Sequence, residues 1–319
     1  MIRFKDESCM VTIFCTSFNH GKYIRETLDS IINQKTQYKF KIVVHDDASV
    51  DDSQQIIAEY VERFPDVIIP ILQKENQFSK GINVYNEHIE SVMRGKYIAY
   101  CECDDFWTDE YKLQKQIDYM EAHPECSMCV HNTKKVDEQG NELNSFFNDL
   151  GIDMDYDAND IILAGGGGLF HTSSYLYRTD LKVIMPSCFA MKKVADYPMA
   201  IYLSTKGYVH YIGEVMSAYR VAAVQSWSTI FNANNKARVA HYLELIDSLQ
   251  AMDEYTNHVY TESFQKKIEE IEYLYLFQTY QLGKILSNTG YKKKFNENSL
   301  MVRLKYLIKS CLMKIKKSE

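Results

Sequence analysis

Residues 96–107 read KYIAYCECDDFW, and this stretch decides the fold class of the 319-residue chain. Residues 97–100 are too few and too rich in β-forming side chains for a helix, so they predict a short buried strand. Three carboxylates follow at once, those of Glu102, Asp104 and Asp105. Ligands of open α/β sheets bind at the carboxyl ends of the strands. We therefore expect these acids to lie at a binding site.

Three acids crowded at one strand end repel one another. A hard divalent cation with oxygen ligands would relieve that repulsion. The alternative is a solvated acidic turn in front of the helix expected near Asp109. The residues alone leave both interpretations open.

Strand-like and helix-like segments alternate along the chain. Apolar runs at 10–18, 40–45 and 67–72 predict strands, and helical spacing predicts helices at 23–32, 54–64 and 83–94. This order predicts an α/β fold with a doubly wound, mostly parallel nucleotide-binding sheet related to the Rossmann type. We also expect a helix at 107–120 and an irregular, mobile segment at 147–160. No G-x-G-x-x-G or G-x-x-x-x-G-K follows the first strand, which disfavours dinucleotide and P-loop modes of binding.

The C-terminal part differs from the rest in pattern and charge. We expect an α/β domain at 1–228 and a helical region at 229–319. Residues 291–319 hold nine Lys or Arg and two Glu, a net charge of +7, so residues 1–290, with 27 bases and 41 acids, carry −14. The acidic body excludes nucleic acid as an expected partner. Residues 300–317 place apolar side chains on one helical face and basic ones elsewhere, which indicates an interfacial helix on anionic lipid, or else a helix packed on its neighbours.

The eight cysteines stand at irregular positions, several of them in apolar runs. This is typical of reduced core thiols in a cytosolic protein. The N-terminus MIRFKDESC lacks the apolar core of a signal peptide. We therefore expect a cytoplasmic protein with peripheral contact at the inner face of the cell membrane.

Four motifs occur in a fixed order, and together they resemble bacterial family 2 nucleotide-sugar glycosyltransferases of the A-type fold. They are TSFNH at 16–20, VVHDDASVDD at 43–52, GKYIAYCECDDFWTD at 95–109 and KLQKQ at 112–116. The resemblance covers about residues 9–225. It implies metal-dependent, inverting transfer of one sugar from a nucleotide-diphosphate donor, a UDP-sugar, to a glycan or lipid-linked acceptor in surface polysaccharide synthesis.

The resemblance also implies roles for single residues. Asp47 would hydrogen-bond the uracil ring, and the other nucleotide-binding residues would be Thr16, Phe18, Asn19 and Asp104. Glu102, Asp104 and Asp105 would hold Mn²⁺ or Mg²⁺, with Glu102 as the first acid of a D-x-D motif. Asp196 falls where the family places its catalytic base. Weaker candidates for acceptor or diphosphate contacts are His171, Ser173 and Arg220.

Two features separate this reading from its competitors. The Q-x-x-R-W motif of processive synthases is absent, which favours transfer of a single sugar. A nucleotidyltransferase would need a Gly-rich, basic loop after the first strand, and residues 17–22 do not provide one. A sugar-nucleotide-binding module without catalysis is the non-enzymatic alternative.

Overall fold

The chain forms two units, Met1–Ala223 and Val224–Glu319, in the computed structural model. The sequence predicts the boundary nearby, after residue 228. The structure describes residues 9–82, 92, 95–164, 169–183, 185–189, 196–221 and 234–318. Apart from Val92, the helix expected at 83–94 lies outside the described residues.

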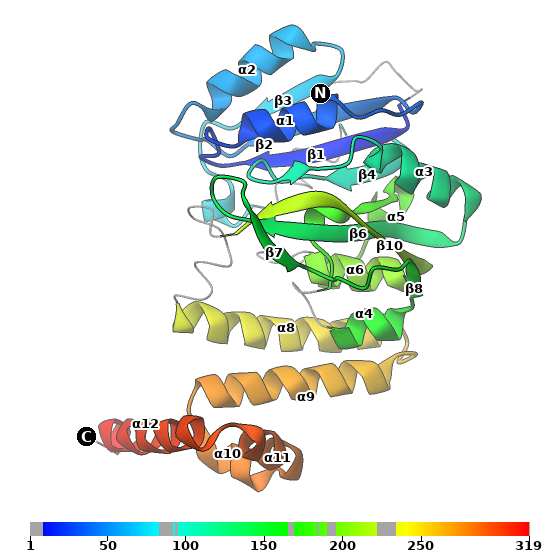
Figure 1. Ribbon diagram of the computed structural model, residues 1–319. Coiled ribbons are helices and arrows are strands. Elements are labelled where there is room, and N and C mark those ends of the chain that lie inside the picture. Colours follow the sequence, from blue (N-terminus) through cyan, green and yellow to red (C-terminus); the bar gives the residue numbers. More distant parts are fainter. Residues whose placement is uncertain are drawn as a thin grey trace. The chain divides into compact units, whose positions relative to one another are not determined.

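A ten-stranded sheet organises the first unit (Figure 1), in the order β3-β2-β1-β4-β9-β6-β10-β5, with β7 beside β6 and β8 beside β10. Its first half is parallel, as the sequence predicted. It consists of β1 (Val11–Ser17), β2 (Phe40–Asp46), β3 (Ile68–Leu72) and β4 (Tyr97–Tyr100). β1 and β2 are nearly continuous apolar runs because both faces of a parallel sheet are covered. The carboxyl ends of β1, β2 and β4 therefore meet at one edge.

The second half of the sheet is mixed. β9 (Leu176–Arg178) runs antiparallel to β4 and to β6 (Cys126–Val136), and β6 is parallel to β10 (Tyr208–Arg220). Three short strands are antiparallel to their neighbours, namely β5 (Phe106–Trp107), β7 (Glu142–Phe146) and β8 (Met154–Tyr156). The long strand β10 thus brings residue 220 back beside the acids that follow β4.

Three helices contribute to one hydrophobic core with the sheet, namely α1 (Ile24–Ile32), α2 (Ser53–Arg63) and α3 (Lys112–Ala122). Their apolar stripes supply fully buried residues such as Leu28, Ile57 and Leu113. Further helical segments in the described part of this unit are α4 (Ala158–Ala164), α5 (Thr179–Val183), α6 (Asp196–Ser204), η1 (Phe78–Lys80), η4 (Thr172–Ser174) and η5 (Ser187–Phe189).

Two expectations about this unit are wrong. Residues 147–160 are not irregular throughout, because they contain β8 and the start of α4, and Tyr156 packs edge-on against Phe170. The expected helix at 107–120 begins only at Lys112, since Trp107 is in β5 and pairs with Ser217 of β10. In both places a partner distant in sequence outweighs the local pattern.

The second unit is helical, as its spacing predicts. Its helices are α8 (Asn235–Tyr255), α9 (Thr261–Gln278), α10 (Leu282–Ser287), α11 (Thr289–Glu297) and α12 (Leu300–Ser318). Leu276, Ile285, Tyr291, Phe295 and Tyr306 form its core cluster. In the described part of the chain, no helix combines the length and the apolar character that crossing a bilayer requires.

Candidate active site

The ends of β1 and β2 are fastened to each other by Asn19. Its backbone N–H donates to Ser49 Oγ at 2.8 Å, and its side-chain Oδ1 accepts the Val50 N–H at 2.9 Å. Asn19 and Ala48 both adopt a positive φ, 57° and 64°, so both turns are tight. Asn19, a predicted nucleotide contact, thus uses its side chain to shape the rim of the site.

Asp47 lies directly after β2 with 6% of its surface exposed. Its carboxylate accepts the Gln77 N–H at 2.7 Å and the Phe78 N–H at 3.1 Å, which holds η1 beside the strand ends. Each carboxylate oxygen has a further lone pair for a ligand. On the paired strand β1, Thr16 lies opposite His45, two residues before Asp47, and is half-buried. Phe18, which follows β1, is 36% exposed.

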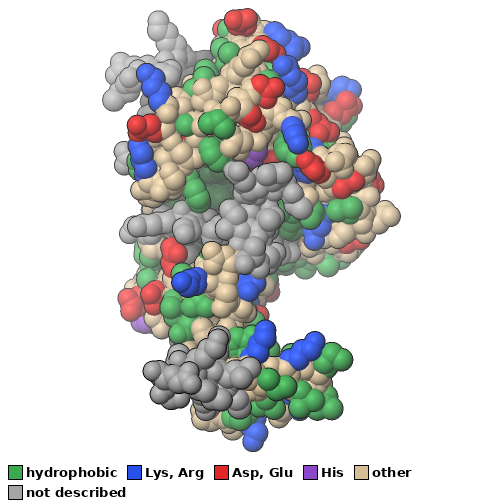
Figure 2. Space-filling model, turned by 90° about the vertical axis from the view of Figure 1, so that its left-hand side faces the viewer, with side chains coloured by type: hydrophobic (Ala, Val, Ile, Leu, Met, Phe, Trp, Pro, Cys, Tyr) green, Lys and Arg blue, Asp and Glu red, His purple; other side chains and the backbone are tan. Residues whose placement is uncertain are grey.

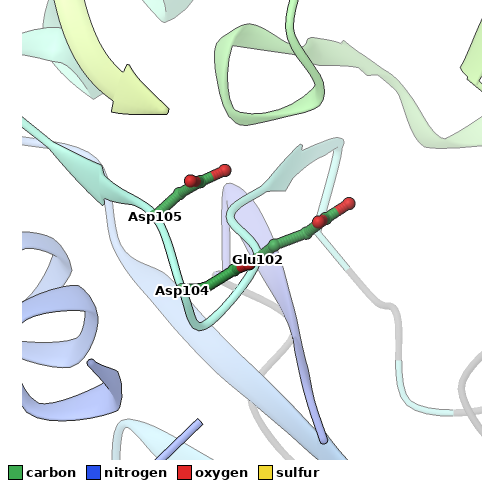
Figure 3. A group of neighbouring side chains, drawn as sticks. All are labelled: Glu102, Asp104 and Asp105. Atoms are coloured by element: carbon green, nitrogen blue, oxygen red, sulfur yellow. The ribbon is translucent and has the colours of Figure 1, made fainter. Parts of the chain in front are cut away.

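The three acids sit on the loop that leaves β4 (Figure 3), and one oxygen from each lies within 4.8 Å of the others. Asp104 and Asp105 are buried, whereas water reaches Glu102. The loop is fixed from β1 and α1: the Cys103 N–H donates to Thr16 O at 2.9 Å, and Thr27 Oγ1 donates to Asp105 O at 2.6 Å. The sequence prediction that these acids gather is confirmed.

Asp105 is surrounded by donors from other elements. It accepts the Arg220 N–H at 2.9 Å and the Ser173 hydroxyl at 3.2 Å, and His171 Nε2 lies 3.5 Å from Oδ2. Burial, and then the nearby charge of Lys135, lowers the pKa of His171 to about 3, so this imidazole is neutral. His171 and Ser173 therefore meet Asp105 rather than open solvent.

The carboxylate of Asp104 has fewer hydrogen-bond donors around it than that of Asp105. Among the described residues, its buried Oδ1 has no hydrogen-bond partner, and its Oδ2 lies 3.9 Å from His20 Nε2. An unpartnered buried carboxylate oxygen is costly unless a donor or a cation meets it. Asp104 Oδ1 is thus the oxygen of this loop best placed to accept a ligand.

Burial, and then repulsion by neighbouring carboxylates, raises the pKa values of two of these acids. The pKa of Asp105 lies well above its usual value because of burial, then the charges of Asp104 and Glu102. The pKa of Glu102 rises to about 8, first because protein atoms surround its carboxyl group and then because of the charges of Asp104 and Asp196. The side chain of Glu102 is nevertheless exposed to water. Asp196, at the start of α6, lies close enough to act on this cluster electrostatically.

Arg220 ties several loops together from the end of β10. It is 2% exposed, and it donates from Nε to Asp104 O at 2.9 Å and from Nη2 to Glu26 Oε2 at 2.6 Å. Its Nη1 donates to Glu138 O at 3.0 Å. All three guanidinium nitrogens therefore hold protein groups, and the diphosphate contact expected of Arg220 stays a prediction.

Two residues beside the acids were missed as site candidates. His20 lies next to Asp104, and Thr172 Oγ1 is 3.5 Å from Glu102 Oε1. The signal for His20 was present, because it closes the motif TSFNH. Thr172 lies between the two candidates His171 and Ser173, but only the position of η4 beside the acid loop reveals its contact.

The family model described as "Glycosyl transferase family 2" matches residues 12–193, more than half of the chain. The chain belongs to glycosyl transferase family 2. A similar protein is "Uncharacterized protein Rv1520" of Mycobacterium tuberculosis, 32% identical over 232 residues that make up 71% of this chain and 63% of that protein. This family 2 chain thus spans under two thirds of the length of that relative.

Solved structures support the A-type fold of this family 2 chain. S. aureus TarS 1-349 in complex with UDP-GlcNAc has a TM-score of 0.57 and 14% identity, covering 94% of this chain and 80% of that one. The mannosyltransferase PcManGT from Pyrobaculum calidifontis, in complex with GDP-Man and Mn²⁺, has a TM-score of 0.53 and 15% identity, with 98% and 90% covered. At these identities the likeness shows the fold alone, and it confirms the predicted fold class.

Proposed function

We propose that this protein is an inverting glycosyltransferase. It moves one sugar from a nucleotide-diphosphate donor, a UDP-sugar, to a hydroxyl of a glycan or lipid-linked acceptor in surface polysaccharide synthesis. The observation that carries the proposal is the gathering of Glu102, Asp104 and Asp105 at the ends of the parallel strands, in a family 2 chain. That edge is where α/β sheets bind their ligands.

The donor's base and ribose would be held by the residues at the strand ends. In the proposal, Asp47 accepts a hydrogen bond from the base, Thr16 and Phe18 line the base pocket, and Asp104 accepts from the ribose. The exposed ring of Phe18 is available for such a contact. The two structural neighbours carry different bases, UDP-GlcNAc in one and GDP-Man in the other, so the base must be tested directly.

The acid cluster fits a divalent cation. Three carboxylates lie within reach of one ion, and one of their buried oxygens lacks a donor among the described residues. Burial, and then repulsion by the neighbouring carboxylates, raises the pKa values of Glu102 and Asp105. Oxygen ligands favour Mn²⁺ or Mg²⁺ over zinc. Asp104 and Glu102 would be the main ligands, because the oxygens of Asp105 already accept from Arg220 and Ser173. A bound ion would stabilise negative charge on the leaving diphosphate.

The proposed general base is Asp196, which would take the proton of the acceptor hydroxyl as that oxygen attacks the anomeric carbon. General base catalysis typically contributes about 10²- to 10⁴-fold to the rate. The electrostatic effect of Asp196 on Glu102 supports a position next to the donor's reacting end. His171 and Ser173 would act through Asp105, by fixing the orientation of its carboxylate.

The proposed place of the reaction is the cytoplasm, with peripheral contact at the inner face of the cell membrane. Seven cysteines of the described chain are free thiols, six of them buried, as is usual in a reducing compartment. The membrane contact concerns the C-terminal helix.

A panel of UDP- and GDP-sugars tests the activity through slow hydrolysis of the donor, and calorimetry with UDP and with GDP, with and without Mn²⁺, tests binding. Asp104→Asn should lose both turnover and metal-dependent nucleotide affinity. Asp196→Asn should lose about 10²- to 10⁴-fold in turnover while keeping nucleotide affinity. Asp180→Asn, also in the first turn of a helix but exposed, is the matched control and should behave as wild type.

Two outcomes would contradict the proposal. Binding of a nucleotide sugar without any turnover in the wild type would point to a binding module instead. Absence of nucleotide binding both with and without the cation would remove the proposed donor site altogether.

A further inference from the structure

The outer side of α12 is an exposed apolar stripe. It consists of Leu300, Met301, Leu304, Leu307 and Ile308, whose exposed fractions range from 37% to 66%. At about 100° per residue, these five positions fall within roughly 120° of the helix circumference. We call this surface the α12 stripe.

The opposite side of α12 holds the helix in its unit. Tyr306 is 3% exposed, its ring packs 4.6 Å from that of Phe277, and its hydroxyl donates to Leu276 O at 3.2 Å. Ser310 Oγ donates to Tyr280 O at 3.0 Å. The α12 stripe is therefore not what closes the core of the second unit. Five large apolar side chains exposed together on one helix face indicate a surface that binds a partner.

The surroundings of the α12 stripe are basic. On α12, Lys305 and Lys309 are exposed along one margin, and the half-buried Arg303 lies at the other. The neighbouring α11 exposes Lys292, Lys293 and Lys294. Figure 2 shows hydrophobic side chains of the second unit gathered near the bottom of the view, with Lys or Arg side chains at their edge. In residues 289–318 the only acid is Glu297.

We propose that the α12 stripe docks on an anionic lipid bilayer, with the helix lying in the plane of the headgroups. Apolar residues framed by lysines are what such a surface binds: the aliphatic chains enter the acyl boundary and the cations pair with lipid phosphates. A protein groove lined only by apolar residues would bury the aliphatic side chains but leave the surrounding cations unpaired, whereas lipid phosphates pair with them. The inference rests on the proposed membrane contact and deepens it by naming the exposed residues that make the contact.

Cosedimentation of the full chain with vesicles tests this proposal, without nucleotide sugar present. Binding to equimolar phosphatidylglycerol and phosphatidylcholine should exceed binding to phosphatidylcholine alone by about tenfold at low salt, and should weaken as salt screens the lysines. Leu304→Glu, within the stripe, should reduce binding to anionic vesicles by about tenfold.

Val302→Glu is the matched control, because Val302 is an aliphatic residue of the same helix, 40% exposed, that lies outside the stripe. It adds the same charge and should change binding by less than about threefold. Circular dichroism checks that both variants are folded, and donor hydrolysis in solution should be unchanged in both. A loss of hydrolysis would concern the proposed reaction, not the docking surface.

Three results would overturn the proposal. One is wild-type protein that ignores anionic vesicles. Another is an equal loss of binding in Leu304→Glu and Val302→Glu, which would mean that net charge alone matters. The third is a wild-type dimer in sedimentation equilibrium that Leu304→Glu dissociates, without any vesicle binding, because the stripe would then bind a second copy of the chain.

Discussion

Glu102 and Asp105 experience the same repulsion in different surroundings. Asp105 is enclosed, and donors from β10 and η4 compensate its charge. Glu102 is exposed to water, and the one hydrogen bond of its side chain among the described residues is the long contact from Thr172 at 3.5 Å. Of these two carboxyl groups, Glu102 is therefore the easier one to ionise. A bound cation would lower the pKa of Glu102 more than that of Asp105.

Glu102→Gln should reveal the cost of ionising Glu102 in a pH series. The folded-state pKa of about 8 lies above the usual 4.5, so ionisation of Glu102 removes stability from the metal-free wild type as pH rises from about 5 to 8. The variant lacks this loss and should gain about 1 kcal/mol on the wild type across that range, a value discounted for the solvent at Glu102. Urea unfolding in EDTA measures it. With Mn²⁺ the wild type should regain its stability, and an unchanged difference would count against a metal at Glu102.

Lys112 is a second residue whose charge is costly. It is fully buried, and its Nζ donates to Gln116 Oε1 at 2.7 Å and lies 4.0 Å from the centre of the Trp107 ring. Burial lowers its pKa to about 7. As the pH falls from about 10 to 7, the unfolded chain binds a proton that the folded chain does not, so stability falls.

Lys112→Met should therefore be more stable than the wild type by about 2–4 kcal/mol at pH 7, and the difference should shrink toward pH 9.5. Urea unfolding at both pH values measures this. Lys115→Met is the matched control, since Lys115 is on the same helix but is partly exposed and paired with Asp109 and Glu214. A pH-independent gain in Lys112→Met would mean that packing, not charge, is responsible.

At the residue scale, the sequence predicted the grouping of side chains that directly follow a strand. Glu102, Asp104 and Asp105 directly follow a run that could only be a strand, so their meeting was predictable. Arg220 could be suggested only as a ligand contact, because its bonds to Asp104 O and Glu26 cross more than a hundred residues. No local pattern encodes such pairs.

At the element scale, the short η4 turn controls how the acid loop is oriented. Its Ser173 reaches Asp105, and its own backbone is held by two residues of the β5–α3 region. Trp107 Nε1 donates to Ser173 O at 3.2 Å, and Gln116 Nε2 donates to Ser174 O at 2.8 Å and to Cys129 O at 2.9 Å. The motif KLQKQ thus acts on the site through η4 without touching a ligand.

Gln116→Met should remove the amide donor that Gln116 supplies to two buried carbonyl groups and lower stability by about 2–4 kcal/mol. It should also weaken metal-dependent UDP binding, because η4 would no longer hold Ser173 against Asp105. Gln114→Met, on the same helix but half-buried, should cost less than about 1 kcal/mol and leave UDP affinity unchanged. Chemical unfolding and calorimetry provide the two readouts. Equal UDP affinities in the two variants would contradict a role of Gln116 in positioning.

Element predictions succeeded where a segment's own periodicity decided its structure. The parallel strands and the C-terminal helices are of this kind. β5 and β8 were missed because each is short and exists only through pairing with β10, whose partners lie far away in sequence. The many acidic residues around Tyr156 made the sequence pattern of this segment look irregular, although a few of its apolar side chains are buried.

At the scale of the whole molecule, every predicted site residue belongs to the first unit. A chain ending after Ser228 should therefore bind UDP within about twofold of the full chain and should lose binding to anionic vesicles, because α12 is missing. Calorimetry and cosedimentation test the two halves of this prediction. A truncated chain that is folded by circular dichroism yet binds no UDP would show that the second unit contributes to the donor site.

The bond from the Arg220 N–H to Asp105 also has a consequence for protein synthesis. A nascent chain that has emerged as far as residue 204 already contains all four motifs, yet it lacks the strand that encloses Asp105. Until β10 leaves the ribosome, Asp105 lacks the Arg220 N–H donor, and the edge of β6 that pairs with β10 is open. The catalytic unit therefore cannot mature gradually from its N-terminus and should reach its native state only after translation has passed residue 220.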